Sequence, residues 1–441
     1  MITRREFGKA AAMGAAGMAL GSTAKSYAQI MGSNERVRFA VIGLHGRGFA
    51  HLSSLKANAD TSHVVAICDV ESTFMAKFAA EAQKELGYAP ENEKDFRRLL
   101  ERKDIDAITI ATPDHWHTPM AIDGLKAGKH VYVEKPCSHN PAEGALLIEA
   151  QRKHGKLVQM GTQQRSSPHT IEIVNKIHGG LIGKAYLATA WYANTRKSIG
   201  HGQPAPVPST LDWDLWQGPA PRTEYRDNVQ PYNWHWFHVW GTGETLNNGT
   251  HEVDVCRWAL GVDYPERISA NGGRYAFHDD WQFYDTLVTN FVYPDATISW
   301  EGRSCNGSRV DGRDRGSIIM GTTGSVLVDR DGYEVYDLKG HKTDEFRVKG
   351  SNTSSADLVG ADSMTDMHFA NFIAGITKGE KLHAPIEVGN VAVTMLQLSN
   401  VAWEVKRELK LDPADGGKVV GDPEAMKYWG REYQPGWEPK I

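Results

Sequence analysis

Two short segments carry side chains that could hold a ligand and move protons. Thr112-Pro113-Asp114-His115-Trp116-His117 follows an apolar run, and Glu134-Lys135-Pro136 follows another. Both runs have the length and composition of buried strands. The carboxyl ends of parallel strands meet at one edge of a sheet, which is where such sheets hold ligands. A lysine whose charge is disfavoured by its surroundings can act there as a base near neutral pH.

A glycine-rich turn follows the first apolar run of the chain. It reads Gly43-Leu44-His45-Gly46-Arg47-Gly48, which departs from G-x-G-x-x-G because a histidine holds the middle glycine position. Such a turn lets backbone N–H groups approach a pyrophosphate at a helix N-terminus. Asp69 stands about 20 residues on, where a carboxylate binds ribose hydroxyls and repels a 2′-phosphate. The arrangement predicts NAD rather than NADP; Arg47 could approach the pyrophosphate or remain solvated.

The elements that must position these motifs alternate between strands and helices. Residues 34–160 contain four strand-like runs separated by helical patterns. The runs are Val37–Ile42, Val64–Cys68, Ala107–Ala111 and His130–Val133, and the helical patterns include Ser72–Leu86 and Met120–Ala127. This alternation predicts a parallel sheet covered on both faces, in a doubly wound Rossmann domain of the α/β class.

Residues 161–409 have a different pattern of strand-like and helical segments, which predicts a second domain of the α+β class. Strand-like runs separated by turn residues predict an open, mainly antiparallel sheet. They are Thr286–Tyr293, Thr297–Trp300, Ser317–Met320 and Ser325–Val328, followed by helical patterns at Met364–Lys378 and Val388–Leu409. Residues 410–441 are polar with several glycines and prolines, which predicts a tail on the surface.

The motifs resemble those of the Gfo/Idh/MocA family, the group of glucose–fructose oxidoreductase and inositol dehydrogenase. The family pattern T-P-x-x-x-H corresponds to Thr112–His117, G-K-H-V-x-x-E-K-P to Gly128–Pro136, and G-x-H-x-x-D to Gly249–Asp254. The resemblance covers essentially the whole chain after its first residues. It implies oxidation of a carbinol, with the hydride passing to a nicotinamide and with Lys135 and His251 at the reacting hydroxyl.

One position departs from the family pattern. Many members carry an aspartate four residues before the histidine of G-x-H, where this chain has Asn247. An asparagine can hydrogen-bond a hydroxyl but cannot take its proton. The acid–base work therefore falls to Lys135 and His251, with Asn247 beside them as a third catalytic candidate.

The motifs and the resemblance together define the predicted binding residues. For the cofactor these are Gly43, His45, Gly46, Arg47, Gly48, Asp69, Thr112, Pro113, Asp114, His117, Glu134, Lys135 and Gln163. For the substrate they are Arg165, Tyr192, Trp234, Trp236 and His251. Aromatic side chains stack on sugar rings and polar ones bind hydroxyls, although each aromatic could equally pack the sheet against its covering loops. The four cysteines lie far apart, and no metal site is expected.

The first 28 residues resemble a twin-arginine export signal. Arg4-Arg5 precedes a weakly apolar run to Leu20, and Ser26-Tyr27-Ala28 has cleavage-site spacing. The alternative is a chance arginine pair before an alanine-rich helix. The run is too short to span a membrane and no cysteine follows it, so no membrane anchor is expected. The expectation is a protein exported folded, by the twin-arginine machinery, to the periplasm.

Composition adds few constraints. The chain has 441 residues, 41% of them hydrophobic, and a net charge of −5. These values fit a two-domain globular protein and give no reason to expect a nucleic-acid partner. The resemblance implies a homo-oligomer, dimer or tetramer.

Three functions fit these observations. The first is an NAD-dependent oxidoreductase acting on a CH–OH group of a sugar or glycoside. Since the periplasm has no free nicotinamide pool, its cofactor would stay tightly bound and be recycled in a redox-neutral or two-substrate cycle. The second is an NAD-dependent glycosidase of the N-acetylgalactosaminidase type, ranked lower because the lysine of E-K-P, replaced in that group, is present as Lys135. The third, a non-catalytic sugar-binding protein, is disfavoured by the intact Lys135 and His251.

Overall fold

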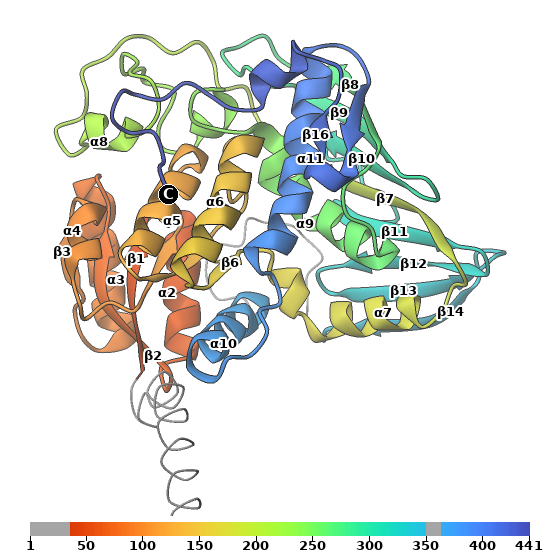
Figure 1. Ribbon diagram of the computed structural model, residues 1–441, viewed down its shortest axis with the longest axis horizontal. Helices are drawn as coiled ribbons and strands as arrows, with labels where there is room; N and C mark the ends of the chain where they lie inside the picture. The colour runs from red at the N-terminus through yellow and green to blue at the C-terminus, as the bar shows by residue number, and fades with distance from the viewer. Residues whose placement is uncertain (1–35, 350–362) are drawn as a thin grey trace, which may run out of the picture.

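The computed structural model of the chain describes residues 36–349 and 363–441. The predicted export signal lies outside these described residues. Two sheets stand side by side with helices between and around them (Figure 1). Within the described ranges, no helix combines the length and the apolar character needed to cross a membrane.

The first sheet has six parallel strands in the order β3-β2-β1-β4-β5-β6. Its strands are β1 (Val37–Ile42), β2 (Ser62–Cys68), β3 (Glu91–Glu93), β4 (Ala107–Ile110), β5 (His130–Val133) and β6 (Val158–Met160). Its connecting helices are α2 (Gly46–Ala57), α3 (Ser72–Leu86), α4 (Phe96–Glu101), α5 (Asp114–Lys126) and α6 (Pro141–His154). The strand order reverses at β1, so a crevice opens at the carboxyl ends of β1 and β4. The predicted Rossmann fold is confirmed.

Helix α5 begins earlier than the sequence pattern predicts. The apolar periodicity starts at Met120, but the helix starts at Asp114, directly after Pro113 as its N-cap. The polar and aromatic side chains of 114–118 are nonetheless buried, because this turn packs against neighbouring Rossmann elements and against loops of the second domain that include Trp216 and Trp240. The T-P-x-x-x-H motif thus forms the first turn of a helix at the crevice.

The second sheet has ten strands in the order β14-β13-β12-β11-β7-β10-β9-β8-β15-β16. All neighbours are antiparallel except β7 and β10, so the predicted mainly antiparallel sheet is confirmed. The strands are β7 (Ala185–Ala193), β8 (Arg267–Gly273), β9 (Thr286–Val292), β10 (Thr297–Arg303), β11 (Arg315–Gly321), β12 (Gly324–Asp329), β13 (Gly332–Asp337), β14 (Lys342–Arg347), β15 (Leu409–Asp412) and β16 (Lys418–Val419).

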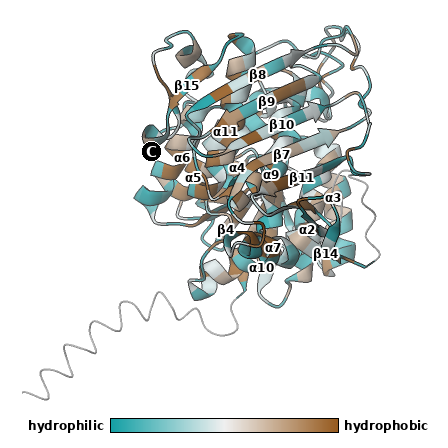
Figure 2. Cartoon of the chain, turned by 90° about the vertical axis from the view of Figure 1, so that its right-hand side faces the viewer, coloured by the Kyte–Doolittle hydropathy of each residue, from teal (hydrophilic) through white to brown (hydrophobic). Residues whose placement is uncertain are grey.

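The two faces of this sheet differ in their surroundings. The inner face packs against α9 (Gly243–Leu260) and α11 (Ile386–Glu404), which lie between the two sheets (Figure 1). Figure 2 shows the outer face, where polar and apolar residues alternate along the strands. The remaining helices are η1 (Gln163–Ser166), α7 (Pro168–His178), α8 (Trp213–Gln217), η2 (Asn233–Trp236), α10 (Ser363–Lys378), η3 (Pro413–Asp415) and η4 (Ala425–Tyr428).

Helix α10 packs on the first sheet although it follows the second in the chain. Phe369 stacks on Tyr132 of β5 with ring centroids 4.2 Å apart, and Phe372 lies 6.3 Å from Phe39 of β1. All four rings are fully buried. Helix α10 therefore completes the apolar layer of the Rossmann sheet beside α2, which chain position alone does not reveal.

The C-terminal region is more ordered than a surface tail. The helix predicted to run to Leu409 ends at Glu404, and Leu409 opens β15 at the edge of the second sheet. Farther on, Arg431 pairs with the buried Glu143 of α6 at 2.7 Å. Trp437 lies edge-on to Trp116 of α5 at 5.4 Å. Many side chains after residue 410 are exposed, but the segment both adds strands to the second sheet and contacts α5 and α6 of the Rossmann domain.

Candidate active site

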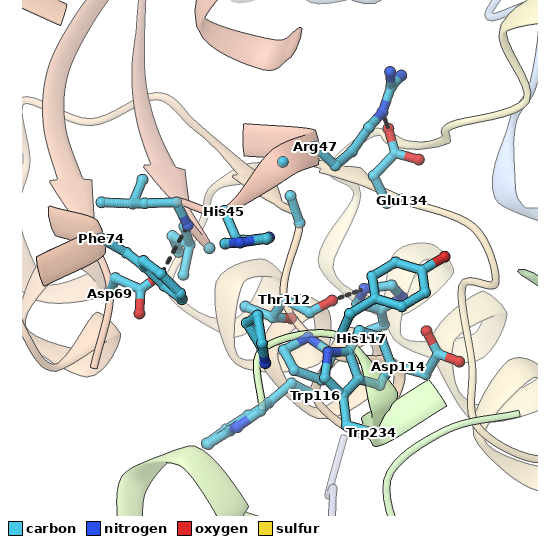
Figure 3. Close-up of a pocket in the computed structure, with 18 of the residues that line it drawn as sticks. His45, Arg47, Asp69, Phe74, Thr112, Asp114, Trp116, His117, Glu134 and Trp234 are labelled. Carbon is cyan, nitrogen blue, oxygen red and sulfur yellow. Dashed lines mark hydrogen bonds and ion pairs between the residues drawn. The ribbon is translucent and has the colours of Figure 1, made fainter. Parts of the chain in front are cut away.

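A cavity lies at the carboxyl ends of β1, β2, β4 and β5 and extends to the first half of α9 (Figure 3). All the predicted cofactor-binding residues line it except Gly48. The catalytic candidates Lys135, Asn247 and His251 line it as well. The structure thus brings the three motifs, which are far apart in the sequence, to one cavity.

The glycine turn has the geometry of a phosphate cradle. Gly43 has φ +88°, and a Cβ there would lie 2.5 Å from the carbonyl oxygen of Ala111. A Cβ at Gly48 would lie 2.3 Å from the carbonyl oxygen of Gly43, so this glycine serves packing. His45 is the N-cap of α2 but its side chain makes no capping bond, and no acidic residue stands in the first turn. The N-terminus of α2 can therefore receive an anionic group such as a pyrophosphate.

Asp69 sits at the end of β2 as the ribose-binding hypothesis requires. Its carboxylate accepts hydrogen bonds from the backbone N–H groups of Leu44 at 2.8 Å and Glu71 at 2.9 Å. Burial raises the pKa of Asp69 to about 6, although these N–H groups favour the charged form. A carboxylate has about four acceptor sites, so positions remain for ribose hydroxyls. The glycine cradle and Asp69 together fit NAD.

Glu134 is the centre of a buried polar network. Its Oε1 accepts from Arg47 Nε at 2.8 Å and Gln163 Nε2 at 3.2 Å, and lies 3.0 Å from His51 Nε2. Burial raises the pKa of this carboxyl, but the Arg47 charge and the His51 hydrogen bond outweigh burial and hold it well below its usual range. Arg47, for which a place at the pyrophosphate and a place in solvent were both considered, lines the cavity, and its ion pair with Glu134 connects the glycine turn to the E-K-P segment (Figure 3).

Lys135 points across the cavity to α9. Its Nζ donates to the backbone carbonyl of Asn247 at 2.5 Å and to Asn247 Oδ1 at 3.2 Å. Asn247 Nδ2 donates to Tyr232 Oη at 3.1 Å and Glu244 Oε1 at 3.3 Å, so the amide oxygen faces the lysine. Burial lowers the pKa of Lys135, and the neighbouring carboxylates of Glu134 and Asp114 only partly offset it. The lysine is therefore poised to release and accept a proton.

His251 stands four residues after Asn247 on α9, which puts both on the same helical face. Burial lowers the pKa of His251 well below its usual value, and the positive charges of Arg330, Lys135 and Arg315 lower it further. The imidazole is thus neutral at neutral pH. A neutral imidazole has one acceptor nitrogen and one N–H, so it can bind a hydroxyl in either sense.

The T-P-x-x-x-H residues fasten the loops around the cavity. The ring nitrogens of His117 lie 2.6 Å from the carbonyl oxygen of Pro136 and 2.8 Å from that of Thr112. Asp114 accepts a hydrogen bond from Thr242 Oγ1 at 2.5 Å, just before α9. Side chains that line the cavity therefore also connect the segments after β4 and β5 and the start of α9.

Three of the predicted substrate residues are not at the cavity. Arg165 is held in a buried bidentate ion pair with Asp254, with nitrogen–oxygen distances of 2.5 and 2.9 Å. Tyr192 is buried beneath the guanidinium of Arg315, and Trp236 stacks on Trp281 at 3.9 Å. These side chains pack the second domain, which was the alternative weighed for the aromatics.

Trp234 does line the cavity and stacks on His235 with centroids 3.5 Å apart. Other lining residues were not predicted as site residues: Phe74, Trp116, Trp216, Tyr232, His235, Asn248, Arg315 and Arg330. Trp116 stands within the T-P-x-x-x-H motif, whereas most of the others lie on helices or loops that no motif marks. Arg315 had one available signal, since a charged residue at an inward strand position needs a partner, here Glu252 at 2.6 Å.

Comparison with known proteins agrees with this geometry. Residues 37–162 match the model of the Gfo/Idh/MocA oxidoreductase family, described as an NAD-binding Rossmann fold. This segment is therefore similar to the NAD-binding domain of that family. The match ends at Thr162, so it includes the glycine turn, the T-P motif and the E-K-P motif but not His251.

Among curated proteins, the chain is similar to an alpha-N-acetylgalactosaminidase of Shewanella oneidensis. The two are 30% identical over 224 residues, which cover 45% of this chain and 49% of that protein. A glycosyl hydrolase family 109 protein of Saccharopolyspora erythraea is 30% identical over 173 residues, covering 38% of this chain and 37% of that protein. The chain thus spans about half the length, or less, of these curated relatives.

Solved structures of other proteins share the fold over most of this chain. An aldose-aldose oxidoreductase of Caulobacter crescentus matches with a TM-score of 0.64 at 17% identity, covering 86% of this chain and 100% of that one. The WlbA dehydrogenase of Bordetella pertussis, solved with NADH and UDP-GlcNAcA, matches with a TM-score of 0.63 at 19% identity, covering 86% and 99%. At these identities the likeness is one of fold.

Proposed function

We propose that the protein is an NAD-dependent oxidoreductase acting on a CH–OH group of a sugar or glycoside. The observation that carries the proposal is Lys135, buried at the cavity of an NAD-binding domain and hydrogen-bonded to Asn247 on the helix that also carries His251. Aromatic and amide side chains such as Trp234 and Asn248 line the same cavity, which suits a polyhydroxylated ring.

The residues divide the chemistry between them. Oxidising a carbinol removes a hydroxyl proton and a hydride from one carbon and leaves a carbonyl; NAD, when bound, accepts the hydride. Lys135 in its neutral form takes the proton, since burial disfavours its charge. The Asn247 amide oxygen and backbone carbonyl hold the ammonium that results. His251 binds the same hydroxyl and orients it.

A cofactor-release assay and a substrate screen test this proposal. Denatured protein should release NAD(H) into the supernatant, and a panel of sugars and glycosides should change the nicotinamide fluorescence of the intact protein. Lys135→Ala should abolish that change while cofactor content stays nearly constant. Lys126→Ala, on the exposed side of α5, is the matched control. Full turnover by Lys135→Ala would contradict the role given to the lysine.

A glycosidase reaction is the second candidate, because the curated relatives bear that name. In this scheme the same residues would oxidise a carbinol to a carbonyl and allow elimination of the glycosidic group as an alcohol. Water would then add to the resulting double bond, and the hydride would return to the carbonyl, so that the net reaction is hydrolysis. We rank this reaction second because the lysine of E-K-P, which is replaced in the N-acetylgalactosaminidase group, is present here as Lys135. Incubation with methyl glycosides separates the two reactions: a glycosidase frees methanol with no net change in cofactor absorbance, whereas a dehydrogenase alters that absorbance and frees none.

The cellular setting belongs to the same proposal. The Arg4-Arg5 segment supports export of the folded protein to the periplasm by the twin-arginine machinery, with NAD tightly bound and recycled. The outer face of the ten-stranded sheet is the surface through which we expect a dimer or tetramer to form. Fractionation of cells expressing Arg4→Lys/Arg5→Lys, and the mass of the purified protein in solution, test these two points.

A further inference from the structure

A loop of the second domain is attached to the Rossmann domain beside the ribose-binding end of the cavity. Residues 210–218, here called the bridging segment, include helix α8 and lie above the carboxyl edge of the first sheet (Figure 1). At one end, Ser72 N donates to Thr210 O at 2.9 Å and Asp212 N donates to Val70 O at 3.0 Å. Lys94 Nζ pairs with Asp212 at 2.6 Å. This end is therefore fixed to the segments that follow β2 and β3.

The other end of the bridging segment is fixed to α5. The carbonyl oxygen of Trp216 accepts from Trp116 Nε1 at 2.9 Å and lies 3.0 Å from His115 Nε2. Gly218 has φ +46°, and a Cβ there would lie 1.9 Å from the Trp116 ring, so only glycine fits. Since β2 and β4 flank β1 in the sheet, the segment crosses over the glycine turn that follows β1.

The residues facing each other across this end of the cavity are suited to a flat aromatic base. Asp69 marks where the ribose would bind, and beyond it the cavity is lined by Phe96 and Lys94 from the first domain. Leu215 and Trp216 of the bridging segment line it from the second domain. Aromatic and apolar side chains bind the faces of a purine through stacking and burial.

The bridging segment is also braced from behind. Trp216 stacks on Trp213 with ring centroids 4.8 Å apart, and Trp240 lies edge-on to it at 5.3 Å. These residues are part of an apolar cluster formed by residues 211–240 of the second domain. Val70, which follows Asp69, packs against this cluster. Opening the segment would break this packing together with the hydrogen bonds at both ends.

We propose that the bridging segment forms the second-domain wall of the adenine site and encloses NAD, so that the cofactor exchanges slowly with solution. This inference rests on the proposed NAD-dependent function but concerns retention rather than catalysis. It assigns to Leu215, Trp216 and the Lys94–Asp212 pair a role in cofactor binding. A dinucleotide held from both domains must wait for the segment to detach before it can leave.

An exchange experiment on the purified holoprotein tests the inference. Protein carrying its endogenous cofactor is mixed with excess isotopically labelled NAD, and incorporation of label is followed by rapid gel filtration. We expect Trp216→Ala to exchange at least about tenfold faster than the unaltered protein. Lys94→Met removes only a half-exposed ion pair and should accelerate exchange about two- to fivefold. Lys84→Met, in an exposed pair on α3, is the matched control and should leave the rate unchanged.

The outcomes separate this inference from the proposed function. Protein that carries and takes up no NAD contradicts the proposed function. Protein that carries NAD but exchanges equally fast in Lys94→Met and Lys84→Met contradicts the bridging role, as does unaltered protein that exchanges within the mixing time. Because Lys94→Met leaves the tryptophan cluster intact, it decides the question even if Trp216→Ala fails to fold.

Discussion

Burial of Lys135 destabilises the folded protein and at the same time suits the side chain to its proposed catalytic role. Its folded pKa lies below the ordinary value of 10.5 because the side chain is buried. Between the two pKa values the unfolded chain binds the additional proton, so Lys135 makes unfolding free energy rise with pH in that window. We expect Lys135→Met to lose about 10²- to 10⁴-fold in turnover without a lower unfolding temperature. Calorimetry at two pH values, together with turnover rates, measures both effects.

The pH dependence of turnover should report the lysine and not the histidine. Turnover should rise with pH along one limb, with an apparent pKa below 10.5, because only neutral Lys135 accepts the proton. No limb should appear near 6.5, since burial and nearby cations keep His251 neutral well below that pH. A limb near 6.5 that disappears in His251→Asn would contradict this assignment.

Glu134 should govern acid stability. Its pKa is held below the ordinary 4.5 by Arg47 and His51 against the effect of burial, so its stabilisation is complete above pH 4.5 and is lost as pH falls toward the folded pKa. Glu134→Gln removes the buried carboxylate that pairs with Arg47 and should lower the unfolding free energy by about 3–5 kcal/mol at neutral pH. Urea titrations should show this difference shrinking below pH 4.5.

Motifs located most of the candidate site because they fix backbone as well as side chains. Gly43 and Lys135 follow strands whose apolar runs are plain in the sequence, so their place at the sheet edge follows from topology. Arg165 and Tyr192 could not be placed this way. Their direction depends on Asp254 and Arg315, which lie far along the chain, and no local pattern encodes those pairings.

At the scale of elements, α10 is the clearest case of long-range packing. Its Phe369 is fully buried against Tyr132 and Phe39 of the first sheet. We expect Phe369→Ala to lower the unfolding free energy by about 3–5 kcal/mol and to weaken NAD retention. Phe346→Ala, at an exposed position on β14, is the control and should cost far less. Equal losses in urea unfolding would contradict the packing role of α10.

Element boundaries were predictable where one local pattern dominates. β1, β5 and α3 have the predicted bounds, since uniform apolar runs or helical periodicity end at clear breaks such as Gly87. The start of α5 and the end of α11 could not be predicted in this way. Asp114 begins a helix amid polar residues that tertiary contacts bury, and residues after Glu404 join a sheet edge whose other strands are distant in sequence.

At the scale of the whole molecule, the two sheets share one site. The Rossmann domain supplies the glycine cradle, Asp69 and Lys135, while α9, β11 and the bridging segment supply the opposite wall. The shared fold with oxidoreductases below 20% identity shows that this two-sheet frame tolerates extensive change in sequence. Most of the residues proposed to face the substrate lie on its second-domain side, outside the segment that matches the family model.

The position of α10 in the sequence also determines when the first sheet can be covered during translation. The sheet that begins at residue 37 keeps one apolar layer uncovered until residues 363–378 leave the ribosome. A nascent chain stopped before that point exposes Phe39 and Tyr132 and needs shielding from aggregation. The apolar layer that supports the first sheet is therefore completed late in translation, when α10 is made.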